Sequence, residues 1–267
     1  MKYGYCLRLD FLKGDAVSQA VFDAVTAAGF DYVELPFRDI WGLSPEDMVK
    51  LKKALQVIPC KACNIFFPGG LTLVGPNKDE AGIRAYLAHM LPLAADLGVE
   101  TLVFGNGGAR KVPEGSSKEA TLDDLRSLVE IMNEYAAKAG IIIAIEPLNT
   151  TETDTINSYG EAVALSQGLS HVTTMIDSYH VAKDGQTYDD VYQHPAALGH
   201  LHTAYPIGRM APSPQDDMAQ YAEFVKMVKQ LGYDGMISVE GGLKASEAEG
   251  IAAEVRACLD VLRRLFE

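Results

Sequence analysis

Residues 141–149 read Ile-Ile-Ile-Ala-Ile-Glu-Pro-Leu-Asn, and this stretch decides how the rest of the chain is interpreted. Five apolar residues lead directly into the carboxylate Glu146, and Pro147 then ends the run because proline cannot donate a ladder hydrogen bond. A continuous apolar run is typical of a strand buried on both faces, as in a parallel sheet. Glu146 would then stand at the carboxyl end of that strand, where parallel α/β folds bind their ligands.

Three later runs end in the same way, on a polar side chain that follows apolar residues. They are Met175-Ile176-Asp177, His200-Leu201-His202 and Ile237-Ser238-Val239-Glu240. Four such ends on neighbouring strands would place three carboxylates and one imidazole at one mouth, where unpaired carboxylates repel each other and a divalent cation removes that cost. A mainly oxygen donor set favours Mn2+, Mg2+ or Co2+ over Zn2+. We therefore predict one divalent-metal site formed by Glu146, Asp177, His202 and Glu240.

The whole chain alternates strand-like and helix-like segments, with no long polar linker. Strands are expected at 3–9, 32–35, 58–66, 101–104, 141–146, 172–177, 200–203 and 235–240. Helices are expected at 15–28, from 44, at 78–97, 121–139, 158–167, more weakly at 180–197, and at 216–231 and 245–266. Eight strand–helix pairs in a chain of 267 residues predict a closed (β/α)8 TIM barrel, formed as a single domain by residues 1–267. Doubly wound open sheets are the alternative, but they usually have fewer strands, and no glycine-rich dinucleotide fingerprint follows the first strand.

Side chains alternate along a strand, so the direction of Glu146 predicts that of its neighbours. If Glu146 faces the interior of the barrel, Ala144 does too, and Ile143 and Ile145 face the helices. The same rule places the side chains of Cys60 and Cys63, which form a C-x-x-C, on opposite faces of their strand. We therefore interpret these cysteines as buried packing residues rather than as a redox or zinc motif.

Composition and charge narrow the range of partners. The formal net charge is −13 and no basic stripe offsets it, so a nucleic-acid partner is not expected. No apolar run is long enough to span a membrane, and the first residues lack the apolar core of a signal peptide. By default these features predict a cytoplasmic location.

Further polar residues lie on the loops that leave the later strands. Glu152, His180 and Arg209 would stand at the rim of the mouth, where they could hold substrate hydroxyls, an oxygen or a carboxylate. His200 shares a face with His202 one step deeper and is expected to support the site. His89, His171 and His194 are interpreted as structural. In the loops 37–43 and 66–75, which are expected to roof the pocket, Trp41, Phe66 and Phe67 could pack against a bound molecule or in the core.

At these residues the chain resembles the sugar phosphate isomerase/epimerase superfamily of xylose isomerase-like TIM barrels. The pattern comprises Glu146-x-x-Asn149-x-x-Glu152, Asp177-x-x-His180, His200-x-His202 followed by an arginine, and Ser238-Val239-Glu240. Within the superfamily the chain most resembles the D-tagatose/D-psicose (allulose) 3-epimerases. One departure concerns the arginine, which in that family lies six residues after the metal-binding histidine in an Asn-Arg-x-x-Pro-Gly context. Here residue 208 is glycine and Arg209 comes one position later, so this loop is rebuilt.

The resemblance implies that Glu146, Asp177, His202 and Glu240 bind the metal, most readily Mn2+. It also implies that Glu146 and Glu240 serve as the catalytic acid/base pair, and that Glu152, His180 and Arg209 hold a small sugar substrate. A homo-oligomer, either a dimer or a tetramer, is implied by the resemblance alone. The implied activity is C3 epimerisation of a non-phosphorylated ketose through a cis-enediolate.

Other activities of the same superfamily remain open. The alternative is an aldose–ketose isomerase or an isomerase of hydroxypyruvate or an inosose, because both outcomes use the same metal and carboxylates. DNA-repair endonucleases with a trinuclear zinc site are disfavoured by six histidines, several of them off the site, and by the negative charge. A barrel with a decayed site is disfavoured because all four ligand positions are intact. A phosphorylated substrate is disfavoured because no glycine-rich phosphate loop is present.

Overall fold

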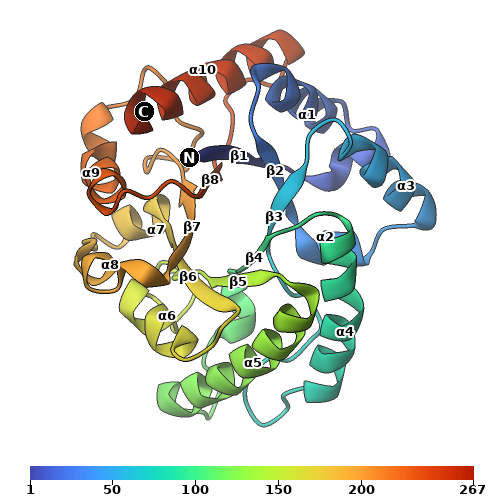
Figure 1. Ribbon diagram of the computed structural model, residues 1–267, viewed down its shortest axis with the longest axis vertical. Coiled ribbons are helices and arrows are strands. Elements are labelled where there is room, and N and C mark those ends of the chain that lie inside the picture. Colours follow the sequence, from blue (N-terminus) through green and yellow to red (C-terminus); the bar gives the residue numbers. More distant parts are fainter.

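The computed structural model describes residues 1–267 and shows eight parallel strands hydrogen-bonded in sequence order around a closed barrel (Figure 1). The strands are β1 Lys2–Cys6, β2 Tyr32–Pro36, β3 Cys60–Asn64, β4 Thr101–Phe104, β5 Ile142–Ile145, β6 Val172–Asp177, β7 Leu198–Thr203 and β8 Met236–Val239. The pairing of Gly4 in β1 with Tyr32 in β2 and with Ser238 in β8 closes the ring. The predicted (β/α)8 TIM barrel is therefore confirmed.

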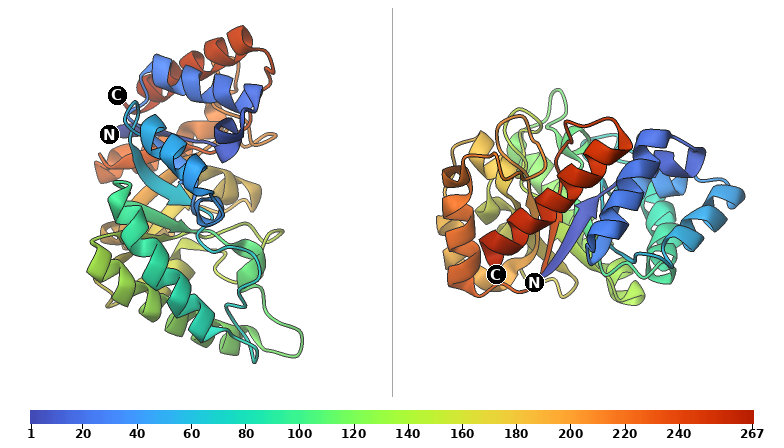
Figure 2. Two further views of the ribbon diagram at one scale, coloured as in Figure 1. Left: turned by 90° about the vertical axis from the view of Figure 1, so that its right-hand side faces the viewer. Right: turned by 90° about the horizontal axis from the view of Figure 1, so that it is seen from above.

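Helices surround the barrel and connect successive strands. The α-helices are α1 Ala16–Ala28, α2 Phe37–Trp41, α3 Pro45–Ala54, α4 Glu80–Asp96, α5 Lys118–Ala139, α6 Tyr159–Ser166, α7 Ser178–Lys183, α8 Asp189–Gln193, α9 Ala222–Leu231 and α10 Ala248–Phe266. Short 3-10 turns are η1 Leu9–Lys13, η2 Gly107–Arg110, η3 Pro195–Ala197 and η4 Met218–Tyr221. The ring closes where α10 packs beside α1, and the two chain termini lie close together (Figure 2). None of the helices combines the length and the apolar character that crossing a membrane requires.

The apolar core lies between the barrel and the helices, as the alternation of side chains predicts. Ile143 and Ile145 belong to this outer core, whereas Ala144 forms a small separate cluster with Val103 and Met175. A parallel barrel buries both faces of each strand, which explains the continuous apolar runs in the sequence. Because only a few apolar residues fill the separate cluster, the remaining interior toward the strand ends is left for polar side chains.

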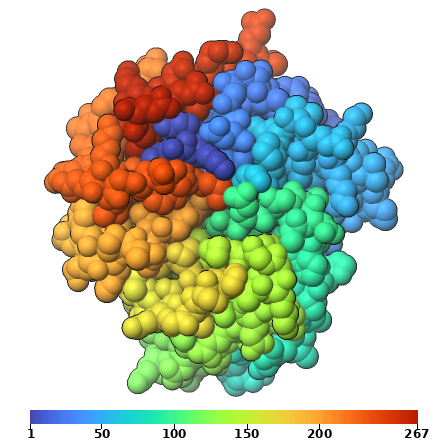
Figure 3. Space-filling view, viewed as in Figure 1, coloured from blue at the N-terminus to red at the C-terminus, as the bar shows by residue number.

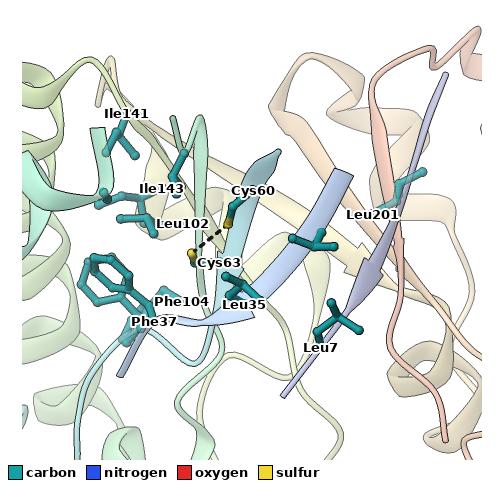
Figure 4. Close-up of a cluster of buried hydrophobic side chains, with 14 of the residues drawn as sticks. Leu7, Leu35, Phe37, Cys60, Cys63, Leu102, Phe104, Ile141, Ile143 and Leu201 are labelled. Atoms are coloured by element: carbon teal, nitrogen blue, oxygen red, sulfur yellow. Dashed lines mark hydrogen bonds between the residues drawn. The ribbon is translucent and has the colours of Figure 1, made fainter. Parts of the chain in front are cut away.

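The two C-x-x-C cysteines do not point to opposite faces, so that prediction is wrong. Cys60 Sγ lies 3.7 Å from Cys63 Sγ, and both side chains are buried in the outer core (Figure 4). The reason is a bulge in β3: Val33 pairs with Cys60 but Glu34 pairs with Ala62, which leaves Lys61 as an extra residue. The extra residue turns the three-residue spacing into a same-face spacing, although the predicted burial holds.

Helix ends follow ordinary capping chemistry, with local shifts from the expected ranges. Asp15 caps α1 by accepting from the Ser18 amide, and Gly29 ends the helix in the left-handed conformation. Helix α5 begins three residues before the expected Thr121 because the Ser117 side chain accepts from the Ala120 amide and caps the helix there. The segment 37–43 is not a simple loop, since residues Phe37–Trp41 form helix α2.

Candidate active site

Four side chains from consecutive strands converge at the carboxyl end of the barrel. Asp177 is the last residue of β6 and lies opposite His202 of β7 in the sheet register. Glu146 and Glu240 directly follow β5 and β8, and their amides donate to Phe104 and Thr203 carbonyls of the neighbouring strands. One ligand atom from each of Glu146, Asp177, His202 and Glu240 lies within 4.8 Å of the others. The structure thus brings together the four residues that the sequence singles out.

The carboxylates of this cluster are held by two cationic side chains. His202 Nδ1 lies 3.2 Å from Glu240 Oε2, and Arg209 Nη2 lies 2.7 Å from Glu240 Oε2 and 3.1 Å from Asp177 Oδ2. Burial tends to raise the pKa of Glu240, but His202 and Arg209 outweigh it and hold that pKa below its usual value. Burial and the neighbouring carboxylates of Glu240 and Glu146 raise the pKa of Asp177 despite the cations nearby. Several carboxylates and two cationic side chains are therefore packed closely together at the mouth of the barrel.

The donor set fits a divalent cation. Glu146 Oε1 is buried and has no hydrogen-bond partner, which is costly for a carboxylate oxygen unless a cation or ligand lies against it. Burial lowers the pKa of His202, but the carboxylates of Glu34 and Glu240 outweigh it and hold the pKa well above its usual value. A cation among Glu146, Asp177 and Glu240 would balance the negative charge of these carboxylates.

His180 presents one ring nitrogen to the same cluster. The Asn149 side-chain amide lies 2.7 Å from His180 Nδ1 and can donate to it, which leaves the proton of the neutral ring on Nε2. Nε2 lies 3.5 Å from Asp177 Oδ2 and 3.7 Å from Glu146 Oε1, and has no hydrogen-bond partner. A buried donor of this kind is suited to a hydroxyl or carbonyl oxygen of a ligand. The same Asn149 amide donates to Glu152 Oε1 at 2.8 Å and so fixes the next rim residue.

Arg209 is held in place by a hairpin that the sequence indicates only as a departure from the family pattern. Tyr205 and Met210 form a bridge with hydrogen bonds of 2.7 and 3.3 Å, and Gly208 at the turn has a φ of +80°. Arg209 itself has a φ of +51°, an uncommon conformation for a non-glycine residue that costs about 1–3 kcal/mol. Its guanidinium also lies 4.6 Å from the centre of the Tyr179 ring. The strained backbone of Arg209 therefore places its guanidinium against the carboxylates of Asp177 and Glu240.

A cavity of about 420 Å³ opens above these residues and is lined by Glu146, Glu152, His180, Arg209, Glu240, Arg38, Asn64, Phe67 and the glycines around Asn106, among others. Asn64 Nδ2 donates to Glu240 Oε1 at 3.0 Å. Of the three aromatic residues considered for sugar packing, Phe67 lines the cavity and Phe66 is buried in the core. Trp41 lies beside Tyr86 and His89 and does not line the cavity. The space suits a small polar molecule.

Two buried charged residues near the site are not among the sequence predictions. Glu34 accepts hydrogen bonds in the barrel interior, and its signal was present, because Tyr32-Val33-Glu34-Leu35-Pro36 repeats the pattern of apolar residues, carboxylate and proline. Arg110 is fully buried and donates to the carbonyls of Phe104 at 3.0 Å and Glu146 at 2.5 Å. Burial lowers its pKa to about 10, so the side chain stays charged at neutral pH. No local sequence pattern marks this arginine.

The chain is similar in sequence and in fold to known ketose 3-epimerases. The chain is 22% identical over 251 residues to a D-psicose 3-epimerase of Agrobacterium fabrum, covering 85% of this chain and 80% of the relative. It is 23% identical to a ketose 3-epimerase of Arthrobacter globiformis, covering 90% and 81% of the two chains. The crystal structure of a D-allulose 3-epimerase from Methylomonas sp. superposes with a TM-score of 0.79 at 19% identity, over 99% of this chain and 96% of that one.

The family assignment rests on a match that spans almost the whole barrel. The sequence profile described as "Xylose isomerase-like TIM barrel" matches residues 22–263, from within α1 to the last turn of α10. This range includes all four strand ends that carry Glu146, Asp177, His202 and Glu240. The chain belongs to the xylose isomerase-like TIM barrel family.

Proposed function

We propose that this enzyme is a metal-dependent epimerase that inverts C3 of a non-phosphorylated ketose. The observation that carries the proposal is the convergence of Glu146, Asp177, His202 and Glu240 within 4.8 Å at the mouth of the barrel. The names of the relatives, D-psicose and ketose 3-epimerases, supply the substrate class and the carbon. The net charge of −13 supports a neutral sugar over a phosphorylated one.

Glu146, Asp177, His202 and Glu240 would hold the cation, with Mn2+ preferred and Mg2+ or Co2+ as alternatives. When bound, a divalent cation supplies Lewis-acid polarisation of a ketone and lowers the cost of negative charge on its oxygen. Without such help, removal of the neighbouring carbon-bound proton by a carboxylate is strongly unfavourable. With a cation bound in the cluster, two of its carboxylates could therefore remove and return the proton on the carbon next to the ketone.

Glu146 and Glu240 would be the acid/base pair. They follow β5 and β8, which β6 and β7 separate in the barrel, so they approach the cavity from different directions. One glutamate removes the C3 proton to leave an enediolate in the substrate, and the other delivers a proton to the opposite face of C3. Return of the proton to the neighbouring carbon would instead give aldose–ketose isomerisation, which remains the alternative within the family.

Glu152, His180 and Arg209 would hold the sugar. His180 offers Nε2–H, Glu152 offers carboxylate oxygens that accept from hydroxyls, and Arg209 offers guanidinium donors at the same cavity. These groups surround the reacting carbons with donors and acceptors in fixed positions, because Asn149 anchors His180 and Glu152 and the hairpin anchors Arg209. Such fixed polar groups orient the C3–H bond toward one of the two glutamates.

The proposal is tested by metal-dependent turnover. Protein stripped with EDTA is incubated with D-fructose, D-tagatose or L-ribulose, with hydroxypyruvate as the isomerase probe, and sugars are separated by chromatography. We expect a C3 epimer only after Mn2+, Mg2+ or Co2+ is restored. Equal turnover by stripped and restored protein would contradict the metal requirement, and an aldose product would replace epimerase by isomerase. The cytoplasmic location and the homo-oligomer stay predictions.

A further inference from the structure

A buried carboxylate lies directly behind the proposed metal site. Glu34 of β2 is fully buried inside the barrel, and three side chains contact its two oxygens. His202 Nε2 lies 2.9 Å from Oε1, while His200 Nε2 and Ser238 Oγ lie 3.0 and 2.6 Å from Oε2. Burying a charge is costly even when hydrogen bonds repay part of the desolvation penalty, so the position of Glu34 calls for an explanation beyond packing.

Counting donors fixes the proton on His202. An ionised carboxylate only accepts, so Ser238 donates its hydroxyl proton and both histidines donate from Nε2. His202 then carries its Nε2 proton toward Glu34 and turns Nδ1 toward Glu240 and Glu146, at 3.2 and 3.7 Å. When the ring is neutral, Nδ1 is the nitrogen with a free lone pair. That nitrogen is the one that faces the carboxylate cluster.

The surrounding strands hold Glu34 in this position. Tyr32 hydroxyl lies 2.8 Å from Ser238 Oγ, which links β2 to β8 across the intervening strand β1. The strand between them carries Gly4, which pairs with both Tyr32 and Ser238. A Cβ at Gly4 would lie 2.2 Å from the Tyr32 ring, so only glycine leaves room for the phenol to cross. The hydroxyls of Tyr32 and Ser238 thus form a braced layer beneath His202.

We propose that Glu34 is a positioning residue that fixes the orientation and tautomer of His202, so that Nδ1 is presented to the metal. The inference rests on the metal site of the proposed function and deepens it. Carboxylates that accept from the second nitrogen of a metal-binding histidine orient the ring and make it more basic. Loss of such a partner weakens metal affinity about 10–100-fold. The role belongs to the barrel interior and requires no contact between Glu34 and the sugar.

The experiment compares Mn2+ binding by metal-stripped wild type, Glu34→Gln and Ser238→Ala, with free Mn2+ followed by electron paramagnetic resonance. Glutamine keeps the shape of the side chain but can donate to His202 and so favour the wrong tautomer. Ser238→Ala removes the contact to Glu34 Oε2 but keeps the Glu34 Oε1 contact to His202 Nε2, so it is the matched control for the loss of a Glu34 partner alone. We expect the Mn2+ Kd to weaken about 10–100-fold in Glu34→Gln and by less than threefold in Ser238→Ala.

A second measurement reads the tautomer in the wild type and does not depend on the variant folding. In Zn2+-loaded protein labelled with 15N-histidine, His202 should carry its proton on Nε2 and bind the ion through Nδ1. A proton on Nδ1 of the loaded protein would overturn the inference, as would an unchanged Mn2+ Kd in folded Glu34→Gln. Two bound ions per chain, one lost in Cys6→Ser, would also overturn it, because Cys6, Glu34 and His202 would then be ligands. If the wild type itself binds no Mn2+, the proposed metal site fails first.

Discussion

The residues of the site interact mainly through ion pairs and charged hydrogen bonds rather than through apolar packing. Arg209 Nη2 contacts both Asp177 and Glu240, and His202 lies between Glu34 and Glu240. Each of these side chains therefore has a counter-charge at hydrogen-bond distance. Glu146 differs because its buried Oε1 has no hydrogen-bond partner, and its nearest ring nitrogens, His202 Nδ1 and His180 Nε2, lie 3.7 Å away.

Substitution of either proposed acid/base residue should nearly abolish turnover. Glu146→Gln and Glu240→Gln keep the side-chain shape but remove the base, and we expect at least about 100-fold lower kcat with ketose substrates. Steady-state kinetics measures the loss, and circular dichroism checks that the barrel is intact. A variant that retains most of its activity would remove that glutamate from the mechanism.

Arg209 should act on substrate binding. Loss of a charge-assisted hydrogen bond costs about 1.5–3 kcal/mol, so Arg209→Gln should raise KM roughly 10–100-fold. Arg38→Gln is the matched control, because Arg38 also lines the cavity but pairs only with the exposed Asp39. Equal effects of the two substitutions on KM would show that Arg209 has no special role.

At the scale of the elements, caps and buried polar contacts fix where strands and helices end. Helix α6 begins with a capping box in which Ser158 and Glu161 satisfy each other's backbone amides. The 3-10 turn η2 carries Arg110, whose guanidinium bridges the ends of β4 and β5.

The capping box should give a pH-dependent contribution to stability. Burial tends to raise the pKa of Glu161, but hydrogen bonds from Lys118 and from the Asn157 and Ser158 amides outweigh it and lower that pKa. A lowered pKa stabilises the fold above the unfolded value of about 4.3, and this contribution is lost as pH falls through the folded pKa. Urea unfolding should show Glu161→Gln less stable than wild type at pH 7, with the gap closing below about pH 4. A gap that is constant with pH would contradict this account.

Arg110 should be important for stability despite its position beside the site. Arg110→Met leaves two buried carbonyls without their donor, at a cost of about 1–3 kcal/mol each. Urea unfolding measures the loss. Arg126 donates to the carbonyls of Leu165 and Gln167 at 2.9 and 3.0 Å but is partly exposed, so Arg126→Met is the control. Similar losses in the two variants would contradict the importance of burial at Arg110.

The elements that could be read from the sequence are those whose signals are local. The apolar run before Glu146 and the helical spacing of residues 15–28 act within a few positions, and the structure follows them with β5 at Ile142–Ile145 and α1 at Ala16–Ala28. The bulge at Lys61 and the partners of Arg110 depend on neighbouring strands, which local patterns do not contain. Glu34 had a local signal, but its role depends on His200 and His202, which lie on β7.

At the scale of the whole molecule, different strands of the barrel contribute different parts of the site. The four proposed metal ligands lie at the carboxyl ends of β5 to β8, whereas the same cavity is also lined by Arg38 in α2, Asn64 at the end of β3 and Gly105 after β4. The sequence order of the segments around the ring is visible on the molecular surface in Figure 3. Closure of β8 on β1 brings Ser238 within hydrogen-bond distance of Tyr32 and Glu34 of β2, so these contacts require the complete ring.

The proposed reaction depends on proton exchange at C3 by a metal-dependent pair of glutamates. The most direct test is proton NMR of D-fructose after incubation in D2O with the Mn2+-loaded protein, with the metal and protein removed before the spectrum is taken. We expect deuterium at C3 in both D-fructose and its C3 epimer, and none after EDTA treatment. Deuterium at C1 with an aldose product would contradict epimerisation, and a C3 epimer formed without deuterium incorporation would contradict exchange through the two glutamates.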